Sequence, residues 1–204
     1  MKNFLRNSLL VALVTINIIA CKKKEDPKPV EENELITTVK LTFTRLDANN
    51  VPVTNQTPIV VTWKDMDGTG SGAPVLSGSV NLMSNTSYNI STEFLDETKN
   101  PAENITTEIS AEKEAHQVFF IRSTTTIFST FSYLDFDANT KPVGLQTRIT
   151  TASTASNGTL RVVLRHEPNK NGVGVSGGDI TNAGGSTDVD TTPAFTVNIT
   201  VPQP

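Results

Sequence analysis

The sequence predicts a mainly β protein, an antiparallel β-sandwich with one short helix, from three observations. Short runs in which apolar and polar residues alternate recur along most of the chain, which is the period of strands that bury one face. Threonine and valine are abundant within a hydrophobic content of 36%, as half-buried strands require. Only one stretch has the start signals of a helix. Because Cys21 is the single cysteine, a packed core rather than a disulfide must stabilise the fold.

Residues 1–20 resemble a bacterial lipoprotein signal peptide. Lys2 and Arg6 form a basic start, and the apolar stretch 9–20 is shorter than the about 20 apolar residues of a transmembrane helix. The segment ends in Ile-Ile-Ala-Cys, which resembles a lipobox. The resemblance implies cleavage before Cys21 and acylation of its sulfur. The alternative is an uncut membrane anchor followed by an unrelated cysteine.

Residues 21–34 predict a disordered, charged tether that begins at the lipidated Cys21. Charged residues and prolines fill this segment, and Val30 is its one core-forming residue. Two or three acyl chains anchor a protein firmly, so the membrane is an expected partner. The run Lys-Glu-Asp at 24–26 resembles signals that send lipoproteins to the outer leaflet of the outer membrane. A lipid-anchored, surface-exposed outer-membrane protein is therefore expected.

Residues 35–204 hold the predicted sandwich. Nine strand-like runs follow one another, and turn-rich loops separate them, as in sandwich folds. The predicted strands cover residues 39–44, 57–63, 78–83, 87–95, 117–122, 126–134, 145–151, 159–166 and 193–201.

The predicted helix begins in the segment Asn-Pro-Ala-Glu. Asn100 would cap the helix, Pro101 would take the first helical position, and Glu103 lies three residues after the cap. Ile105 and Ile109 lie one turn apart, on a face that could cover the sheet.

A short internal repeat leaves the number of sandwich units open. Residues 47–53 and 137–143 share Asp, Ala, Asn, Pro and Val at the same spacing. Either the chain holds two small tandem units with a boundary near 123–126, or one extended unit uses the same hairpin turn twice. Asp, Asn and Pro are common in tight turns in any case.

One stretch resembles immunoglobulin-like and fibronectin type III sandwiches. Leu82, Thr86 and Tyr88 match the leucine, threonine and tyrosine of that pattern, and Trp63 ends an earlier strand. The resemblance implies that the tyrosine hydroxyl bonds back to a preceding turn and that Trp63 lies in the core. Ser84 stands where that pattern often has a proline.

The two histidines are candidate ligands of zinc or another divalent ion. His116 follows Glu112 by four residues, and His166 directly precedes Glu167. If the two strand ends converge, imidazole and carboxylate groups would provide the ligands that such an ion prefers. The alternative is that each histidine closes its strand by bonding a neighbouring loop.

Two acidic turns are candidate calcium sites. Asp65 and Asp67 follow one aromatic strand end, and Asp135 and Asp137 follow another. Neither turn has a glutamate at its twelfth position, so neither is an EF-hand. Clustered carboxylates could still bind Ca²⁺, while hairpin turns also use Asp for backbone hydrogen bonds.

Composition and motifs argue against two classes of function. The net charge is −4 and the predicted sandwich has no basic block, which argues against a nucleic-acid partner. Residues 174–178 match G-x-S-x-G, but no histidine follows Ser176 to complete a triad. The same glycine-rich loop matches G-x-G-x-x-G without the helix that a nucleotide-binding motif needs. We therefore expect that the protein is not an enzyme.

Several segments together resemble a family of bacterial lipoproteins labelled "type 1 periplasmic binding fold superfamily protein". That label implies alternating strands and helices around a parallel sheet, whereas the residue pattern predicts a β-sandwich. The resemblance assigns no site residue. The matching segments are ELITTVKLT (34–42), NPAENIT (100–106), EAHQVFF (114–120), LRHEPNK (164–170) and GDITNAGGSTD (178–188).

The expected function is that of a non-catalytic module on the outer membrane. Its loops would bind a ligand or dock onto an outer-membrane transporter or receptor, since loops on a rigid scaffold commonly carry binding. A structural or adhesive surface protein is the first alternative, and a metal-dependent enzyme is the second.

Overall fold

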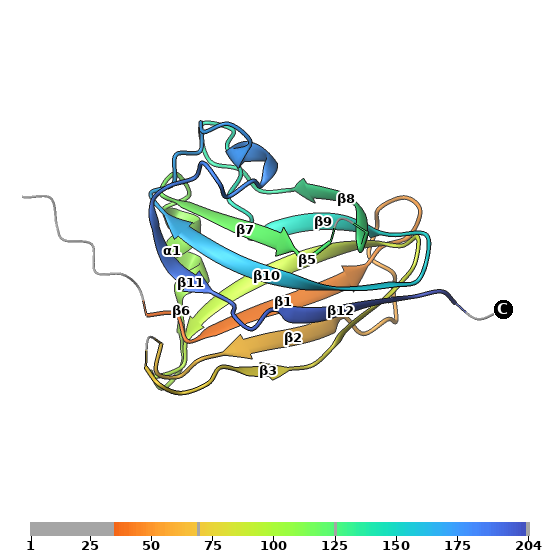
Figure 1. Cartoon of the computed structure of the whole chain (residues 1–204), viewed down its shortest axis with the longest axis horizontal. Helices are drawn as coiled ribbons and strands as arrows, with labels where there is room; N and C mark the ends of the chain where they lie inside the picture. Colours follow the sequence, from red (N-terminus) through yellow and green to blue (C-terminus); the bar gives the residue numbers. More distant parts are fainter. Residues whose placement is uncertain (1–34, 69, 125, 203–204) are drawn as a thin grey trace, which may run out of the picture. The chain divides into compact units, whose positions relative to one another are not determined.

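The computed structural model describes residues 35–68, 70–124 and 126–202 (Figure 1). The predicted signal peptide (1–20), the predicted lipidation site Cys21 and the predicted tether (21–34) lie outside these described residues. Over the described part of the chain, no helix has the length and apolar character that crossing a bilayer requires.

Two facing β-sheets and one short helix make up the fold, which confirms the predicted mainly β sandwich (Figure 1). A seven-stranded sheet has the order β3-β2-β1-β5-β9-β8, with β6 on β5, and a five-stranded sheet has the order β11-β10-β12-β4, with β7 on β10. The pairs are antiparallel except β12 with β4, which is parallel. The elements are β1 (Thr38–Arg45), β2 (Ile59–Lys64), β3 (Val75–Ser77), β4 (Val80–Met83), β5 (Ser87–Asp96), β6 (Glu103–Asn104), α1 (Ile105–Ala111), β7 (His116–Arg122), β8 (Phe128–Tyr133), β9 (Gln146–Thr151), β10 (Ser156–His166), η1 (Val175–Gly177), β11 (Ser186–Asp190) and β12 (Phe195–Thr200).

Each of the nine predicted runs overlaps an observed strand, and three of the observed strands were not predicted. Strands β3 and β6 are too short to show a period, with three and two residues. Strand β11 has the polar sequence Ser-Thr-Asp-Val-Asp, and it lies in the glycine-rich segment 172–190, which the sequence predicts to be one long flexible loop. That interpretation was wrong, because pairing with β10 makes this segment a strand.

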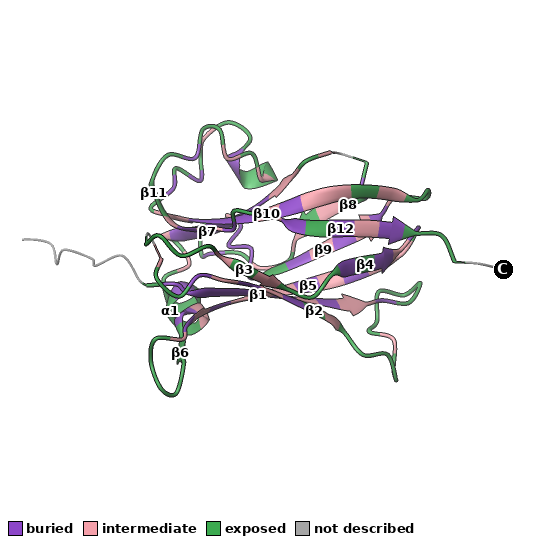
Figure 2. Ribbon diagram, turned by 60° about the horizontal axis from the view of Figure 1, so that its bottom comes forward, coloured by how far each residue is buried: buried purple, intermediate pink, exposed green. Residues whose placement is uncertain are grey.

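The core takes side chains from both sheets, and Figure 2 shows buried residues in the strands of each sheet. Alternate residues of β5 are buried along its whole length, as expected for a strand with one face on a core. Tyr88 belongs to this buried face, and its hydroxyl accepts a hydrogen bond from the backbone N–H of Met83 at 3.0 Å. Trp63 is also buried in the core. Both features expected from the resemblance to immunoglobulin-like sandwiches are therefore present.

The helix begins later than the sequence indicated. Asn104, rather than Asn100, caps α1, and its side chain accepts a hydrogen bond from the backbone N–H of Thr106 at 3.1 Å. Glu103 and Asn104, the two residues before the helix, pair with β5 as β6, which keeps them extended. Ile105 and Ile109 are buried in the core, as predicted.

The internal repeat is one turn used twice in a single sandwich. The carboxylate of Asp47 accepts hydrogen bonds from the backbone N–H groups two and four residues later, at 2.8 and 2.9 Å. Asp137 makes the same pair of bonds at 2.9 and 2.8 Å. The described residues between 35 and 202 form one compact unit, so the repeat reflects turn chemistry within one extended sandwich.

Candidate metal centre

His116 and His166 face each other at one end of the five-stranded sheet. β7 begins at His116, β10 ends at His166, and the two residues are direct partners in the β7–β10 register. Both lie two residues from core side chains, Val118 and Leu164, so they share the core-facing side of the sheet. His166 Nδ1 lies 3.0 Å from His116 Nε2. The two strand ends therefore converge.

A β-bulge brings Asp188 to the two histidines. In the β10–β11 register Leu164 pairs with Val189, while Arg165 pairs with Thr187. Asp188 is the extra residue between these pairs, and such bulges redirect side chains. Asp188 Oδ2 lies 3.9 Å from His116 Nε2, and one ligand atom from each of the three residues lies within 4.8 Å of the others. In Figure 1 β11, the end of β10 and α1 lie at the same end of the molecule.

The C-terminus of α1 sets the tautomer of His116. Its Nδ1 lies 3.1 Å from the backbone carbonyl oxygen of Glu112, and because a carbonyl only accepts, Nδ1 must carry the proton. Burial lowers the pKa of His116, which favours the neutral ring. Nε2 then presents a lone pair to His166 and Asp188. A histidine that donates its other N–H to a backbone carbonyl is the usual arrangement of a metal ligand.

Asp188 is a buried carboxylate that no hydrogen bond satisfies. Its side chain is 4% exposed, and neither carboxylate oxygen has a hydrogen-bond partner. Burial raises the pKa of Asp188 to about 6. A buried polar group without a partner costs about 1–3 kcal/mol, and more when it is charged. A cation beside the imidazoles would offset that cost.

The donor set suits Zn²⁺ or a related divalent transition metal. Zinc takes imidazole nitrogen and carboxylate oxygen at about 2.0–2.1 Å, which places two donors of a tetrahedral site about 3.3 Å apart. The observed separations from His116 Nε2 are 3.0 Å to His166 and 3.9 Å to Asp188, on either side of that value. Ca²⁺ prefers sites made of oxygen ligands. Three protein ligands leave at least one position for water or another donor.

Glu112 and Glu167, which were predicted as metal ligands beside the histidines, do not belong to this cluster. The side chains of Glu112 and Glu167 are exposed. Glu112 contributes its carbonyl instead, and the backbone N–H of Glu167 donates to Ala115 O at 2.6 Å, which ties the end of β10 to the start of β7. The carboxylate near the histidines is Asp188, which the sequence analysis did not select.

Hydrogen bonds within the fold occupy the carboxylates of the second acidic turn. Asp135 accepts from the backbone N–H groups of residues 144–146 at 2.9–3.1 Å. Asp137 caps its turn and pairs with Lys170 Nζ at 3.0 Å. Within the described residues, His116, His166 and Asp188 are the cluster of potential metal ligands, so neither acidic turn gathers three such groups.

A cleft lies next to His116, His166 and Asp188, the three potential ligands that we call the metal cluster. Its volume is about 460 Å³, and Asp188 lines it together with Trp63, Asp65, Asp67 and Asp190. The first acidic turn therefore faces the same space as Asp188. Of the three potential metal ligands, Asp188 is the one that lines this cleft.

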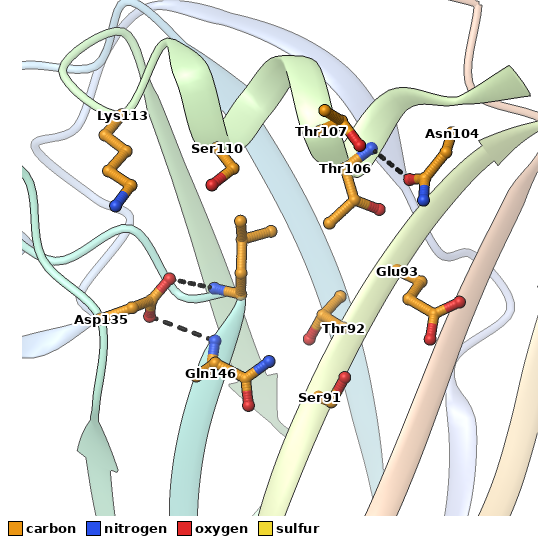
Figure 3. Close-up of a pocket in the computed structure, with 11 residues that line it drawn as sticks. Ser91, Thr92, Glu93, Asn104, Thr106, Thr107, Ser110, Lys113, Asp135 and Gln146 are labelled. Carbon is orange, nitrogen blue, oxygen red and sulfur yellow. Dashed lines mark hydrogen bonds between the residues drawn. The ribbon is translucent and has the colours of Figure 1, made fainter.

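A second, more polar cavity of about 520 Å³ lies between α1, β5 and the start of β9 (Figure 3). Hydroxyl groups from α1 and β5 line it, together with Lys113 and Glu93. Figure 3 shows the carboxylate of Asp135 bonded to backbone N–H groups of β9 and of the residue before it. This cavity contains no cluster of metal ligands among the described residues.

The G-x-S-x-G match lies in a turn between β10 and β11. Ser176 belongs to η1, and its hydroxyl donates to the backbone carbonyl of Lys170 at 2.9 Å. Gly174 and Gly178 flank it in left-handed conformations. The segment is a compact loop, without the strand-to-helix turn of a nucleophile elbow.

Comparisons with protein-family models, curated proteins and solved structures find no match to this chain. The functional assignment therefore rests on the geometry of His116, His166 and Asp188.

Proposed function

We propose that this protein is a lipid-anchored outer-membrane module that captures a divalent transition-metal ion, with Zn²⁺ the expected ion. The observation that carries the proposal is the buried carboxylate of Asp188, which has no hydrogen-bond partner and lies beside two imidazoles. The sequence predicts a non-catalytic binding module without naming its ligand, and we propose that the ligand is this metal ion. A metal transporter or receptor in the same membrane would be the partner.

The protonation states support this function near neutral pH. Metal binding needs imidazole lone pairs and an ionised carboxylate. The hydrogen bond from His116 Nδ1 to the carbonyl of Glu112 leaves the lone pair of its Nε2 directed toward His166 and Asp188. The site can therefore accept a dication without a large rearrangement of the backbone.

Equilibrium dialysis of the metal-stripped protein against Zn²⁺ tests the proposal. We expect about one Zn²⁺ per chain, and a Co²⁺ complex with visible absorption bands typical of a site with nitrogen and oxygen ligands. Asp188→Asn and His166→Gln should each lose the bound ion. Glu167→Gln removes a neighbouring exposed carboxylate and serves as the matched control, which should bind as the unmodified protein does. The proposal fails if the unmodified protein binds no ion or if Asp188→Asn binds it fully.

Metal-dependent catalysis is a second candidate function. Catalytic zinc sites use three protein ligands and keep a position for water or substrate, and this cluster also has three ligands beside a cleft. The zinc-loaded protein would then hydrolyse activated esters or phosphoesters faster than Asp188→Asn. Equal rates for the two proteins would leave metal capture as the function.

A further inference from the structure

We propose that the cleft beside Asp188 is a binding site for a ligand with the chemistry of a lysine residue. Such a ligand has a protonated primary amine, an alkyl chain and a carbonyl acceptor. This inference goes beyond metal capture and does not require a bound ion. It follows from the charge of the cleft, its apolar wall and two buried groups without hydrogen-bond partners.

The cleft carries charge of one sign. Asp65, Asp67, Asp188 and Asp190 line it, and none of the described residues that line it is Lys or Arg. Arg161 lies 3.1 Å from Asp190 and offsets part of this charge. A cleft lined by one sign of charge concentrates ions of the opposite sign, so a cationic group is the expected occupant.

Trp63 provides evidence for a ligand that is independent of the carboxylates. Its side chain is buried, with 4% exposure, and its indole Nε1 has no hydrogen-bond partner. Buried tryptophan N–H groups usually find an acceptor. A metal ion cannot accept a hydrogen bond from Nε1, whereas a ligand carbonyl can.

The remaining wall of the cleft suits an alkyl chain. Leu35, Ile36 and Val189 line it with the ring of Trp63, and lysine side chains pack their methylene groups on such surfaces while the amine stays near polar groups. A volume of about 460 Å³ lies within the range of about 300–1,000 Å³ that is usual for small-molecule sites. A single ion would leave most of this space unused.

Asp188 belongs both to the cleft and to the metal cluster, but binding of the amine does not depend on binding of the ion. One carboxylate oxygen, Oδ2, is the atom placed 3.9 Å from His116 Nε2, and both oxygens lack hydrogen-bond partners. A carboxylate can bind a metal through one oxygen and accept a hydrogen bond at the other. The amine can therefore occupy the cleft with or without the ion.

Fluorescence of Trp63 gives a direct assay, since it is the chain's only tryptophan. The probe is Nα-acetyl-lysine methylamide, and its control is the same molecule with the side-chain amine acetylated. We expect a saturable change in emission with the probe and at least tenfold weaker binding of the neutral control. A peptide with one central lysine separates the two sources of this chemistry. Tighter binding of the peptide than of the single residue assigns the cleft to a partner protein, and equal binding assigns it to a small ligand.

Two double variants test the role of the charge. Asp67→Asn with Asp190→Asn should weaken binding of the probe about tenfold. Asp47→Asn with Asp179→Asn makes the same change in net charge in turns that do not line the cleft and should leave binding unchanged. His166→Gln removes a ligand of the metal cluster that does not line the cleft, and it should bind the probe normally. The two proposals can thus fail separately. No saturable signal in the unmodified protein, or equal affinity for the neutral control, would overturn the inference.

Discussion

Replacing Lys170 by Met should destabilise the fold by about 3 kcal/mol. Lys170 Nζ lies 3.0 Å from Asp137 Oδ2, and the two side chains are 5% and 2% exposed. Removing one partner of a buried ion pair costs about 3–5 kcal/mol, because the other charge is left uncompensated. The lower end applies here, since the turn also donates two backbone N–H groups to the carboxylate of Asp137.

A half-exposed pair with the same substitution provides the control. Lys40 lies 2.9 Å from Glu93, with the two side chains 34% and 35% exposed, and an exposed pair contributes about 0–1 kcal/mol. The free energy of unfolding, measured with urea, should therefore fall much more for Lys170→Met than for Lys40→Met. Equal losses in the two variants would refute the reasoning that burial makes the pair important.

The pH dependence provides a second check on the same pair. Burial would raise the pKa of Asp137, but hydrogen bonds from the backbone N–H of Lys141 and from Lys170 outweigh it and hold that pKa below its ordinary value of 3.8. A carboxyl group whose pKa is lowered by folding stabilises the fold above its unfolded pKa, and this contribution is lost as the pH falls through the folded pKa. The difference between the unmodified protein and Lys170→Met should therefore narrow below about pH 4. A difference that stays constant down to pH 2 would contradict this assignment.

Two further predictions concern the metal cluster and the loop before β11. Asp188→Asn should stabilise the metal-free protein by about 1–3 kcal/mol at pH 7, because burial raises the pKa of Asp188 to about 6 and each pKa unit corresponds to about 1.4 kcal/mol for the ionised carboxyl. Zn²⁺ should raise the melting temperature of the unmodified protein but not of this variant. A melting temperature of metal-free Asp188→Asn below that of the metal-free unmodified protein would contradict the predicted stabilisation. Gly185→Ala should strongly destabilise the fold, since its φ is +69° and an added Cβ would lie 2.2 Å from the carbonyl oxygen of His166. Gly184 has a similar φ of +59°, but a Cβ added there would meet nothing within 4 Å. The smaller loss of stability expected for Gly184→Ala therefore measures the backbone strain alone. Equal losses of stability in the two variants would show that the contact with His166 has no effect.

Local sequence patterns were sufficient to predict the positions of most strands and much of the core. A strand with one buried face, such as β5, alternates buried and more exposed residues with a period of two. This alternation of residue types can be read directly from the sequence. The same holds for the two Asp turns, whose hydrogen bonds are formed within five residues. The start of α1 was predicted too early because residues 103–104 pair with β5, which is a tertiary interaction that overrides the local cap signal of Asn100.

By itself, the sequence determined the sandwich class, the buried faces, the capped turns and the two histidines as candidate ligands. The lipid anchor at Cys21 remains a prediction from the same source. Tertiary structure alone decided which carboxylate joins the histidines. Asp188 lies in a polar, glycine-flanked segment with no apolar alternation, and a bulge opposite β10 directs its side chain. Strand register over long sequence separations sets the distances between these three groups, and no local pattern of residues encodes that register.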